Sequence, residues 1–148
     1  MVQRLFHAGL AGDDILSGGA GIDTASYEQA AAGVQVSLLA GLATGGAGND
    51  TLSEFENIRG SAYADMLTGD NGSNALSGLA GADQMIGLGG DDEYWVDNLG
   101  DLIVEAVGGG YDRVFAKVDY TLADNVESLT LIGRGNIDAY GNDLDNIL

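Results

Sequence analysis

The chain has 148 residues and is strongly acidic, with 23 Asp and Glu against 5 Lys and Arg and a formal net charge of −18 at pH 7. Hydrophobic residues make up 45% of it, as in an ordinary globular domain, which conflicts with so high a charge unless cations neutralise it. The lack of Cys excludes disulfides and thiolate metal sites, no stretch is apolar enough to span a membrane, and the basic residues are too few for nucleic-acid binding.

Aspartate accounts for 17 of the acidic residues. Its short carboxylate offers the hard oxygen ligand that calcium prefers. A solvated acidic surface is the alternative, and it predicts Asp and Glu scattered along the chain. The regular spacing of the aspartates instead favours a bound multivalent cation.

A nine-residue pattern recurs along the chain. The best copies have glycine at positions one, two and four, Asp at position six and a large apolar residue at position eight. The copies are Gly9–Ser17, Gly18–Ser26, Gly45–Ser53, Gly60–Thr68, Gly69–Ser77, Gly78–Ile86, Gly87–Trp95 and the partial Gly141–Leu148. The glycines allow positive φ and close backbone packing, so the first six positions predict a turn and the last three a short strand.

The eighth position of each copy is predicted to point into a core. The residues expected there are Leu16, Leu52, Leu67, Leu76, Met85 and Tyr94. In the second copy, Ala25 is small for this position.

The first departure from the pattern covers residues 27–44. Val34, Val36 and Leu38 alternate with polar residues, which predicts a half-buried strand, and a second strand could pass through Leu42 and Ala43. We expect this segment to be a structural insert in the repeat array.

The stretch from Ser53 to Arg59 leads into the Gly60 copy. Phe55 and Ile58 could pack inside a larger coil, with Glu54 and Glu56 outside. A break in the repeat register is expected here, because the separation of Asp50 and Asp65 is not a multiple of the nine-residue repeat.

The second departure covers residues 96–140. Strands are predicted at Leu102–Ala106, Arg113–Asp119 and Val126–Ile132. In the middle strand, Val114, Ala116 and Val118 would face one way and the residues between them the other. A separate antiparallel domain is the alternative, but no linker precedes these strands, so we expect them to continue the same array.

Two copies make one full coil, so turns on the same edge recur every 18 residues. Asp65 and Asp83 have this spacing, as do Asn74 and Asp92. Stacked coils lie about 4.8 Å apart, so a calcium ion could bridge carboxylates of successive turns, with backbone carbonyls completing ligands at ~2.3–2.6 Å. Asp101 follows Asp83 at the same spacing but lacks the turn glycines, which makes it a weaker candidate.

The eight copies resemble the RTX, or hemolysin-type calcium-binding, nonapeptide repeat. The resemblance implies an all-β fold, a right-handed parallel β-roll or β-helix solenoid with several calcium ions between stacked glycine-rich turns. It further implies that the insert is a widened coil or a hairpin on the solenoid wall and that the second departure forms wider, non-consensus coils. We expect one solenoid over residues 1–148, with first repeats at 9–26, a strand insert at 27–44, the main repeat block at 45–95, wider coils at 96–140 and the start of a further repeat at 141–148.

The predicted metal ligands take the sixth position and the turn glycines of the copies. The side-chain ligands are Asp14, Asp23, Asp50, Asp65, Asn74, Asp83 and Asp92. The glycines, which would offer backbone carbonyls, are Gly9, Gly12, Gly18, Gly21, Gly45, Gly48, Gly69, Gly72, Gly78, Gly81, Gly87 and Gly90.

The resemblance also implies a biological role. Such modules belong to larger secreted bacterial proteins that leave the cell unfolded through type I secretion machinery and fold on meeting extracellular calcium. We therefore expect an extracellular fragment of a larger protein, acting as a folding and secretion module.

No catalytic motif accompanies the repeats. One histidine cannot make a His-Glu-x-x-His site, and there is neither a G-x-S-x-G elbow nor a Cys nucleophile. We therefore expect no enzymatic activity. The alternative function is a carbohydrate-binding or adhesin module that presents the solenoid wall to a polysaccharide, for which Tyr63, Tyr94, Trp95 and Tyr111 are candidate contacts.

Overall fold

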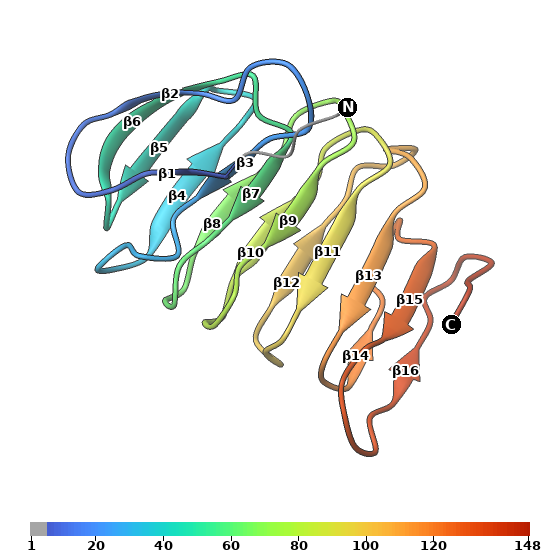
Figure 1. The fold of residues 1–148 in the computed structure, drawn as a ribbon. Helices are drawn as coiled ribbons and strands as arrows, with labels where there is room; N and C mark the ends of the chain where they lie inside the picture. Colours follow the sequence, from blue (N-terminus) through green and yellow to red (C-terminus); the bar gives the residue numbers. More distant parts are fainter. Residues whose placement is uncertain (1–5) are drawn as a thin grey trace.

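The computed structural model describes residues 6–148, which form short β-strands and contain no helix, and so none long and apolar enough to cross a membrane. The first eight strands are β1 (Phe6–Ala8), β2 (Ile15–Ser17), β3 (Thr24–Ser26), β4 (Val34–Ser37), β5 (Leu42–Gly45), β6 (Gly48–Ser53), β7 (Asn57–Arg59) and β8 (Met66–Thr68). The others are β9 (Ala75–Ser77), β10 (Gln84–Ile86), β11 (Glu93–Val96), β12 (Leu102–Val104), β13 (Arg113–Ala116), β14 (Tyr120–Thr121), β15 (Ser128–Leu131) and β16 (Ala139–Tyr140) (Figure 1).

The strands stack into two seven-stranded sheets, so the chain winds as a solenoid. The first sheet has the order β1-β3-β7-β9-β11-β13-β15 and is parallel throughout. The second has the order β12-β10-β8-β4-β5-β6-β2, and β14 and β16 form a separate pair. Because alternate strands of the repeat block belong to opposite sheets, each pair of nonapeptides completes one coil. The predicted all-β, parallel solenoid is confirmed.

The strand register follows the predicted 18-residue step through the repeat block. Met66, Gln84 and Leu102 are successive partners in the second sheet, and Asn57, Ala75 and Glu93 are successive partners in the first. Beyond the consensus repeats the step changes. The step from Glu93 to its partner Arg113 is longer than in the repeat block, and the next step, from Arg113 to Ser128, is shorter.

The insert between the second and third copies is a hairpin in the wall of the second sheet. β4 pairs with β5 and β5 with β6, both antiparallel, whereas β4 pairs with β8 and β6 with β2 in parallel. Gly45 and Gly48 pair across the tight β5–β6 turn, so this copy does not make the expected crossing between sheets. The antiparallel β5 reverses the chain within one sheet, and glycine serves the reversal because φ is +111° at Gly45 and +119° at Gly48.

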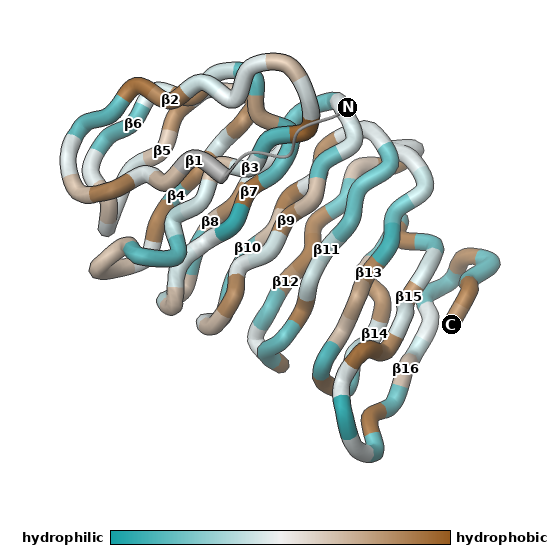
Figure 2. The backbone as a smooth tube through the Cα atoms, in the orientation of Figure 1, coloured by the Kyte–Doolittle hydropathy of each residue, from teal (hydrophilic) through white to brown (hydrophobic). Residues whose placement is uncertain are grey.

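The core runs between the two sheets. Leu67, Leu76, Met85 and Tyr94 have no exposed surface, and Leu52 is buried, as predicted for the eighth position. Leu16 is only partly buried, but it packs against the same core. In Figure 2, the strands alternate along their length between hydrophobic and hydrophilic residues, as expected for strands with one buried face.

The non-consensus coils also bury one face of each strand and expose the other. Val114 and Ala116 are fully buried and Val118 packs against the core, whereas Arg113 and Lys117 are exposed. The strands are shorter than predicted. For example, β12 ends at Val104, because Ala106 starts a turn in which its carbonyl accepts a hydrogen bond from Gly109 N.

Candidate metal centre

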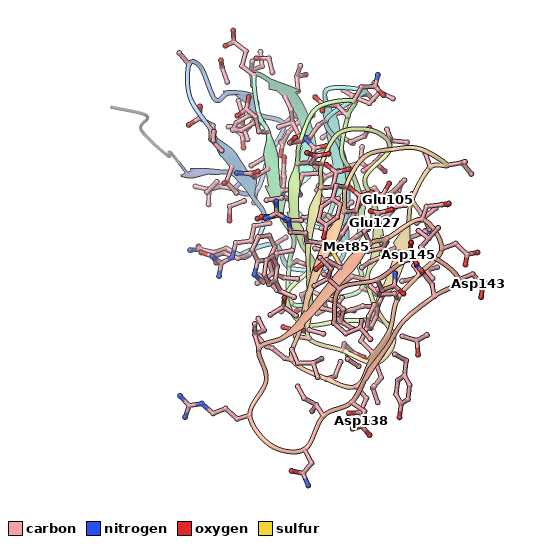
Figure 3. All side chains as sticks on the ribbon, turned by 90° about the vertical axis from the view of Figure 1, so that its right-hand side faces the viewer. Met85, Glu105, Glu127, Asp138, Asp143 and Asp145 are labelled. Atoms are coloured by element: carbon pink, nitrogen blue, oxygen red, sulfur yellow. The ribbon has the colours of Figure 1, made fainter. Side chains whose placement is uncertain are left out.

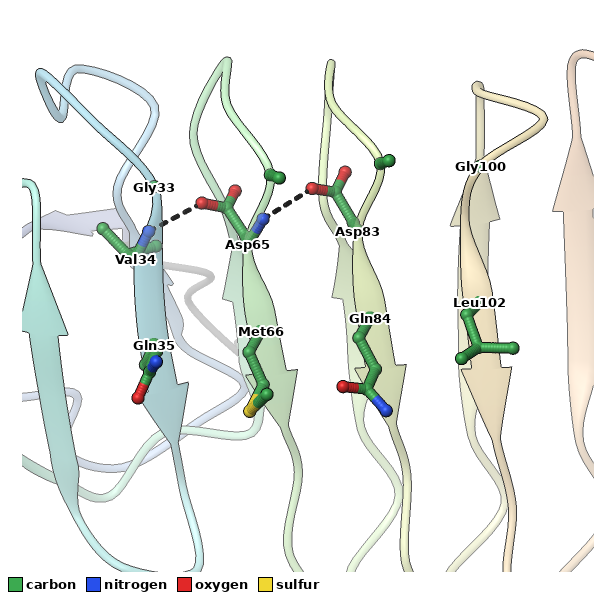
Figure 4. A pocket seen from close by; sticks show the side chains of 11 residues that line it. Gly33, Val34, Gln35, Asp65, Met66, Asp83, Gln84, Gly100 and Leu102 are labelled. Atoms are coloured by element: carbon green, nitrogen blue, oxygen red, sulfur yellow. Dashed lines mark hydrogen bonds between the residues drawn. The ribbon is translucent and has the colours of Figure 1, made fainter.

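An aspartate ends each turn on one edge of the solenoid and precedes a strand of the second sheet. Asp65, Asp83 and Asp101 come directly before β8, β10 and β12. The Asp65 backbone N–H donates to Oδ1 of Asp83 at 2.9 Å, and the Asp83 N–H donates to Oδ1 of Asp101 at 3.1 Å. The same ladder reaches the insert, where Val34 N donates to Asp65 Oδ1 at 2.8 Å (Figure 4).

A second ladder runs along the opposite edge, before the strands of the first sheet. Asn74 N donates to Asp92 Oδ1 at 2.7 Å, Asp92 N to Asp112 Oδ1 at 2.8 Å, and Asp112 N to Glu127 Oε2 at 2.8 Å. Each of these backbone N–H groups thus donates a hydrogen bond to a carboxylate oxygen of the next coil. The two ladders fix the side chains in columns, and Oδ2 of Asp83, Asp92 and Asp112 takes no part in their hydrogen bonds.

The remaining carboxylate oxygens indicate a cation. Asp83, Asp92 and Asp112 are each at most 1% exposed, and their Oδ2 atoms are buried without a hydrogen-bond partner among the described residues. A buried anionic oxygen without a partner costs several kcal/mol in order-of-magnitude terms, and native proteins pair such charges or bind a metal with them. A cation in each column would satisfy these oxygens.

The first position of a copy must be glycine, because a Cβ there would overlap the side chain at the sixth position of the same copy. A Cβ at Gly60, Gly69, Gly78 or Gly87 would overlap the side-chain oxygen of Asp65, Asn74, Asp83 or Asp92, respectively. At the fourth position, a Cβ on Gly81 would meet the Tyr63 carbonyl oxygen and one on Gly90 the Gly72 carbonyl group. The turns therefore bring carboxylate oxygens close to backbone carbonyl oxygens, and calcium prefers oxygen ligands of these two kinds.

Burial makes these carboxylates reluctant to ionise when no cation is bound. Desolvation raises the pKa of Asp83 and of Asp112 to about 6 and that of Asp92 to about 7, and neighbouring carboxylates add to each shift. The pKa of Asp101 is also raised, first by desolvation. The folded state is thus electrostatically unfavourable at neutral pH unless positive charge enters the columns.

The N-terminal predicted ligands are arranged differently from those of the main block. Asp14 N donates to Asp50 Oδ1 at 2.9 Å, so this pair forms a ladder across 36 residues. Asp23 N donates to Glu56 Oε2 at 2.8 Å, which brings in a glutamate that the nonapeptide pattern does not mark. The hairpin strands β4 and β5 separate the coil of Asp50 from that of Asp65.

The predicted turn glycines fall into three groups. Gly69, Gly78, Gly81, Gly87 and Gly90 pack against ladder residues or the neighbouring turn, and Gly72 lies near Asp70. Gly45 and Gly48 lie in the hairpin strands. Of the first two copies, Gly9 packs against Tyr27 and Gly18 against the Glu54 carbonyl, whereas Gly12 and Gly21 have φ of +131° and +144°.

The nonapeptide pattern missed Asp112, Glu105 and Glu127 and gave little weight to Asp101. Asp92, Glu105 and Asp112 each place one carboxylate oxygen within 4.8 Å of the others. Asp101 had a usable signal, because its distance from Asp83 along the chain matches the register. Asp112 had a weaker one, because it follows a glycine-rich stretch, but the longer coil that it ends hides it from any fixed period.

Comparison with known proteins agrees with this geometry. The family described as RTX calcium-binding nonapeptide repeat matches the chain in four copies, over residues 8–25, 42–53 and 56–97. The chain is also similar to the endo-1,3-1,4-beta-glycanase ExsH of Rhizobium meliloti (strain 1021), with 36% identity over 91 residues. That similarity covers 62% of this chain but only 18% of the glycanase.

Proposed function

Because this chain belongs to the RTX calcium-binding nonapeptide-repeat family, which implies Ca²⁺ as its ion, we propose that it is a structural module folded by calcium outside the cell. The observation that carries the proposal is the pair of carboxylate ladders, in which one side-chain oxygen holds the neighbouring coil and Oδ2 of Asp83, Asp92 and Asp112 is buried without a partner among the described residues. The ligands we propose are the ladder aspartates together with carbonyls of the glycine turns.

The physical basis is a balance between charge repulsion and ion binding. With a net charge of −18 and buried carboxylates stacked in columns, the cation-free coils repel one another. A site that exists only in the folded state adds about 2.7 kcal/mol of stability when calcium is at 100 times its Kd. Several such sites outweigh the marginal stability of a domain of this size, about 5–15 kcal/mol.

A calcium titration followed by far-UV circular dichroism tests the proposal. The chelated chain should show a coil spectrum and change cooperatively to β as calcium is added, but not with magnesium, which demands a stricter octahedral geometry. Full β structure in chelator at pH 8 would contradict it.

The pH dependence of the chelated protein provides a second test of the proposal. The raised pKa values of Asp83, Asp92 and Asp112 mean that the folded state takes up protons more readily than the unfolded chain. Stability from this source is fully present below the usual Asp pKa and is lost as the pH rises through about 6–7. Chelated protein should therefore keep more β structure at pH 4 than at pH 8.

We further propose that the module serves export of a larger bacterial protein through type I secretion machinery. The support is the family membership and the similarity to a protein of which this chain spans only 18%. Such export needs a chain that stays unfolded in the cytosol and folds at the calcium level of extracellular modules, about 10⁻⁴–10⁻³ M. Folding already at micromolar calcium in the titration would count against export of an unfolded chain.

A second candidate function, polysaccharide binding, is favoured by the outer face of the first sheet. The rings of Trp95 and Phe115 stack there with centroids 5.3 Å apart, and Arg113 and Lys117 flank them on the same segment. Trp95 borders two adjacent grooves, one of which also includes Arg59. Tyr94 cannot take part, because it is fully buried, while Tyr63 and Tyr111 are exposed.

The relative named as a 1,3-1,4-β-glycanase suggests the glycan to try first. We expect calcium-loaded protein to be retarded in a gel containing soluble 1,3-1,4-β-glucan, and Trp95→Ala to move freely because the sugar-stacking surface is lost. Tyr63→Ala serves as the control and should be retarded like the parent, because Tyr63 lies in the turn between β7 and β8 and lines neither groove that Trp95 borders. Equal mobility of parent and Trp95→Ala would remove this candidate.

A further inference from the structure

Three carboxylates meet where the consensus repeats end. Asp92 closes the last consensus turn, whereas Glu105 and Asp112 come from the following, non-consensus turn between β12 and β13. Both of the latter lie outside the residues that match the repeat family. Their oxygens lie within 4.8 Å of one another, and Asp92 and Asp112 have no exposed surface.

Glu105 occupies the place of a turn glycine. Ile86 pairs with Val104, so Glu105 lies beside Gly87, the first glycine of the preceding coil. A Cβ at Gly87 would overlap the Tyr94 hydroxyl, Asp92 Oδ2 and Glu105 Oε1 at once, which shows that these three atoms converge on one point. The Tyr94 hydroxyl donates a hydrogen bond to Glu105 Oε1 and so holds the carboxylate in place.

The buried oxygens of the cluster lack protein partners. Oδ1 of Asp112 accepts the Asp92 N–H, whereas Oδ2 of Asp92 and Oδ2 of Asp112 are buried without hydrogen-bond partners among residues 6–148. The ion pairs of the described residues involve other acids, namely Glu28, Glu93 and Asp97. Three carboxylates at this distance repel strongly, and the basic side chains in those ion pairs do not offset them.

We propose that Glu105 joins the ladder residues Asp92 and Asp112 in a three-carboxylate calcium site at the end of the repeat block, in which a glutamate replaces the glycine of the repeat. The site binds a divalent cation with three carboxylates, one more than a pair of stacked turns supplies. It joins the last consensus turn to the β12–β13 turn, so calcium bound there stabilises the non-consensus coils as well. Figure 3, which views the stack from its C-terminal side, shows Glu105 and Glu127 on the same edge.

The inference rests on calcium binding by the module, and a count of bound ions tests it separately from calcium-driven folding. Glu105→Gln keeps the size of the side chain and its hydrogen bond to Tyr94 but removes the charge. Isothermal titration of the full chain should show one calcium ion fewer, or one site weakened at least tenfold. Glu93→Gln, which removes the same charge from the outer face of β11, should bind like the parent.

Terbium gives a second readout. Because the Tyr94 hydroxyl lies in the cluster, terbium bound there should luminesce on excitation of tyrosine, and Glu105→Gln should lose most of that emission while Glu93→Gln keeps it. Glu105→Asp, which withdraws the carboxylate without changing the net charge, should behave like Glu105→Gln. Unchanged ion count and emission in Glu105→Gln would overturn the site even if calcium still drove folding. A lost ion in a chain that folds without calcium would instead support the site and contradict the folding proposal.

Discussion

The double variant Asp83→Asn and Asp92→Asn is expected to lose calcium-driven folding at calcium levels that fully fold the parent. Asn keeps the oxygen that accepts the N–H of the neighbouring coil but replaces the buried Oδ2 with an amide nitrogen, which cannot ligate a cation. Asn74 already occupies a ladder position, where its Oδ1 accepts the Asp70 N–H at 2.7 Å and its Nδ2 donates to the Glu56 carbonyl at 2.9 Å. The variant therefore removes a ligand from each ladder with little change of shape.

The expected loss is large because one change falls in each column. If each affected site contributes about 2.7 kcal/mol at 100 times its Kd, roughly 5 kcal/mol of calcium-dependent stability disappears. The calcium midpoint measured by circular dichroism should rise at least tenfold. In chelator, by contrast, the variant should be no less structured than the parent, because two repelling charges have gone.

Two exposed acids provide the matched control. Asp119→Asn and Asp124→Asn remove the same charge from side chains outside the two ladders, and the Asp119 oxygen that accepts Asp138 N at 2.9 Å can be kept by Asn. This control should fold at the calcium midpoint of the parent. A control that shifts as far as Asp83→Asn and Asp92→Asn would mean that net charge, rather than ligation, governs folding.

Gly90→Ala is expected to be among the most damaging single methyl additions in the chain. The φ of Gly90 is +108°, and a Cβ there would meet backbone atoms of Gly72 and Ser73 in the coil below. A side chain at such φ costs on the order of 1–3 kcal/mol, and overpacking adds a similar amount. Since backbone cannot move aside as a side chain can, the calcium-loaded protein should lose roughly 2–6 kcal/mol of stability and melt about 5–20 °C lower.

The neighbouring glycine provides the comparison. A Cβ at Gly89 would find no atom nearer than 3.8 Å, and its φ lies outside the left-handed region. Gly89→Ala should therefore change the melting temperature by only about 1–3 °C, which corresponds to less than about 1 kcal/mol. Equal melting temperatures for the two variants would show that the turns do not stack as closely as the structure describes.

The repeat block was predictable from sequence because each nonapeptide specifies its own turn and its own strand. Glycines that only a tight turn needs, an Asp directly before the strand and one apolar residue per strand recur at a fixed step. The inward positions of Leu67, Leu76, Met85 and Tyr94 and the 18-residue register follow from that step and are confirmed. The family and the identity of the ion follow from the same pattern.

Tertiary structure decided what happens where the step fails. The Gly45 copy fits the repeat best, yet its turn closes a hairpin, because antiparallel pairing of β5 with β4 and β6 is a long-range choice that a local motif does not encode. Likewise, Asp112 enters the ladder after a longer step from Asp92, and Glu105 meets both from a position where the repeat has glycine. Sequence thus determined the repeat step and the ion that the family implies, while the stacking of coils of unequal length decided which carboxylates meet. The physical reason is that hydrogen bonds align the strands, whatever the number of residues in the turn between them.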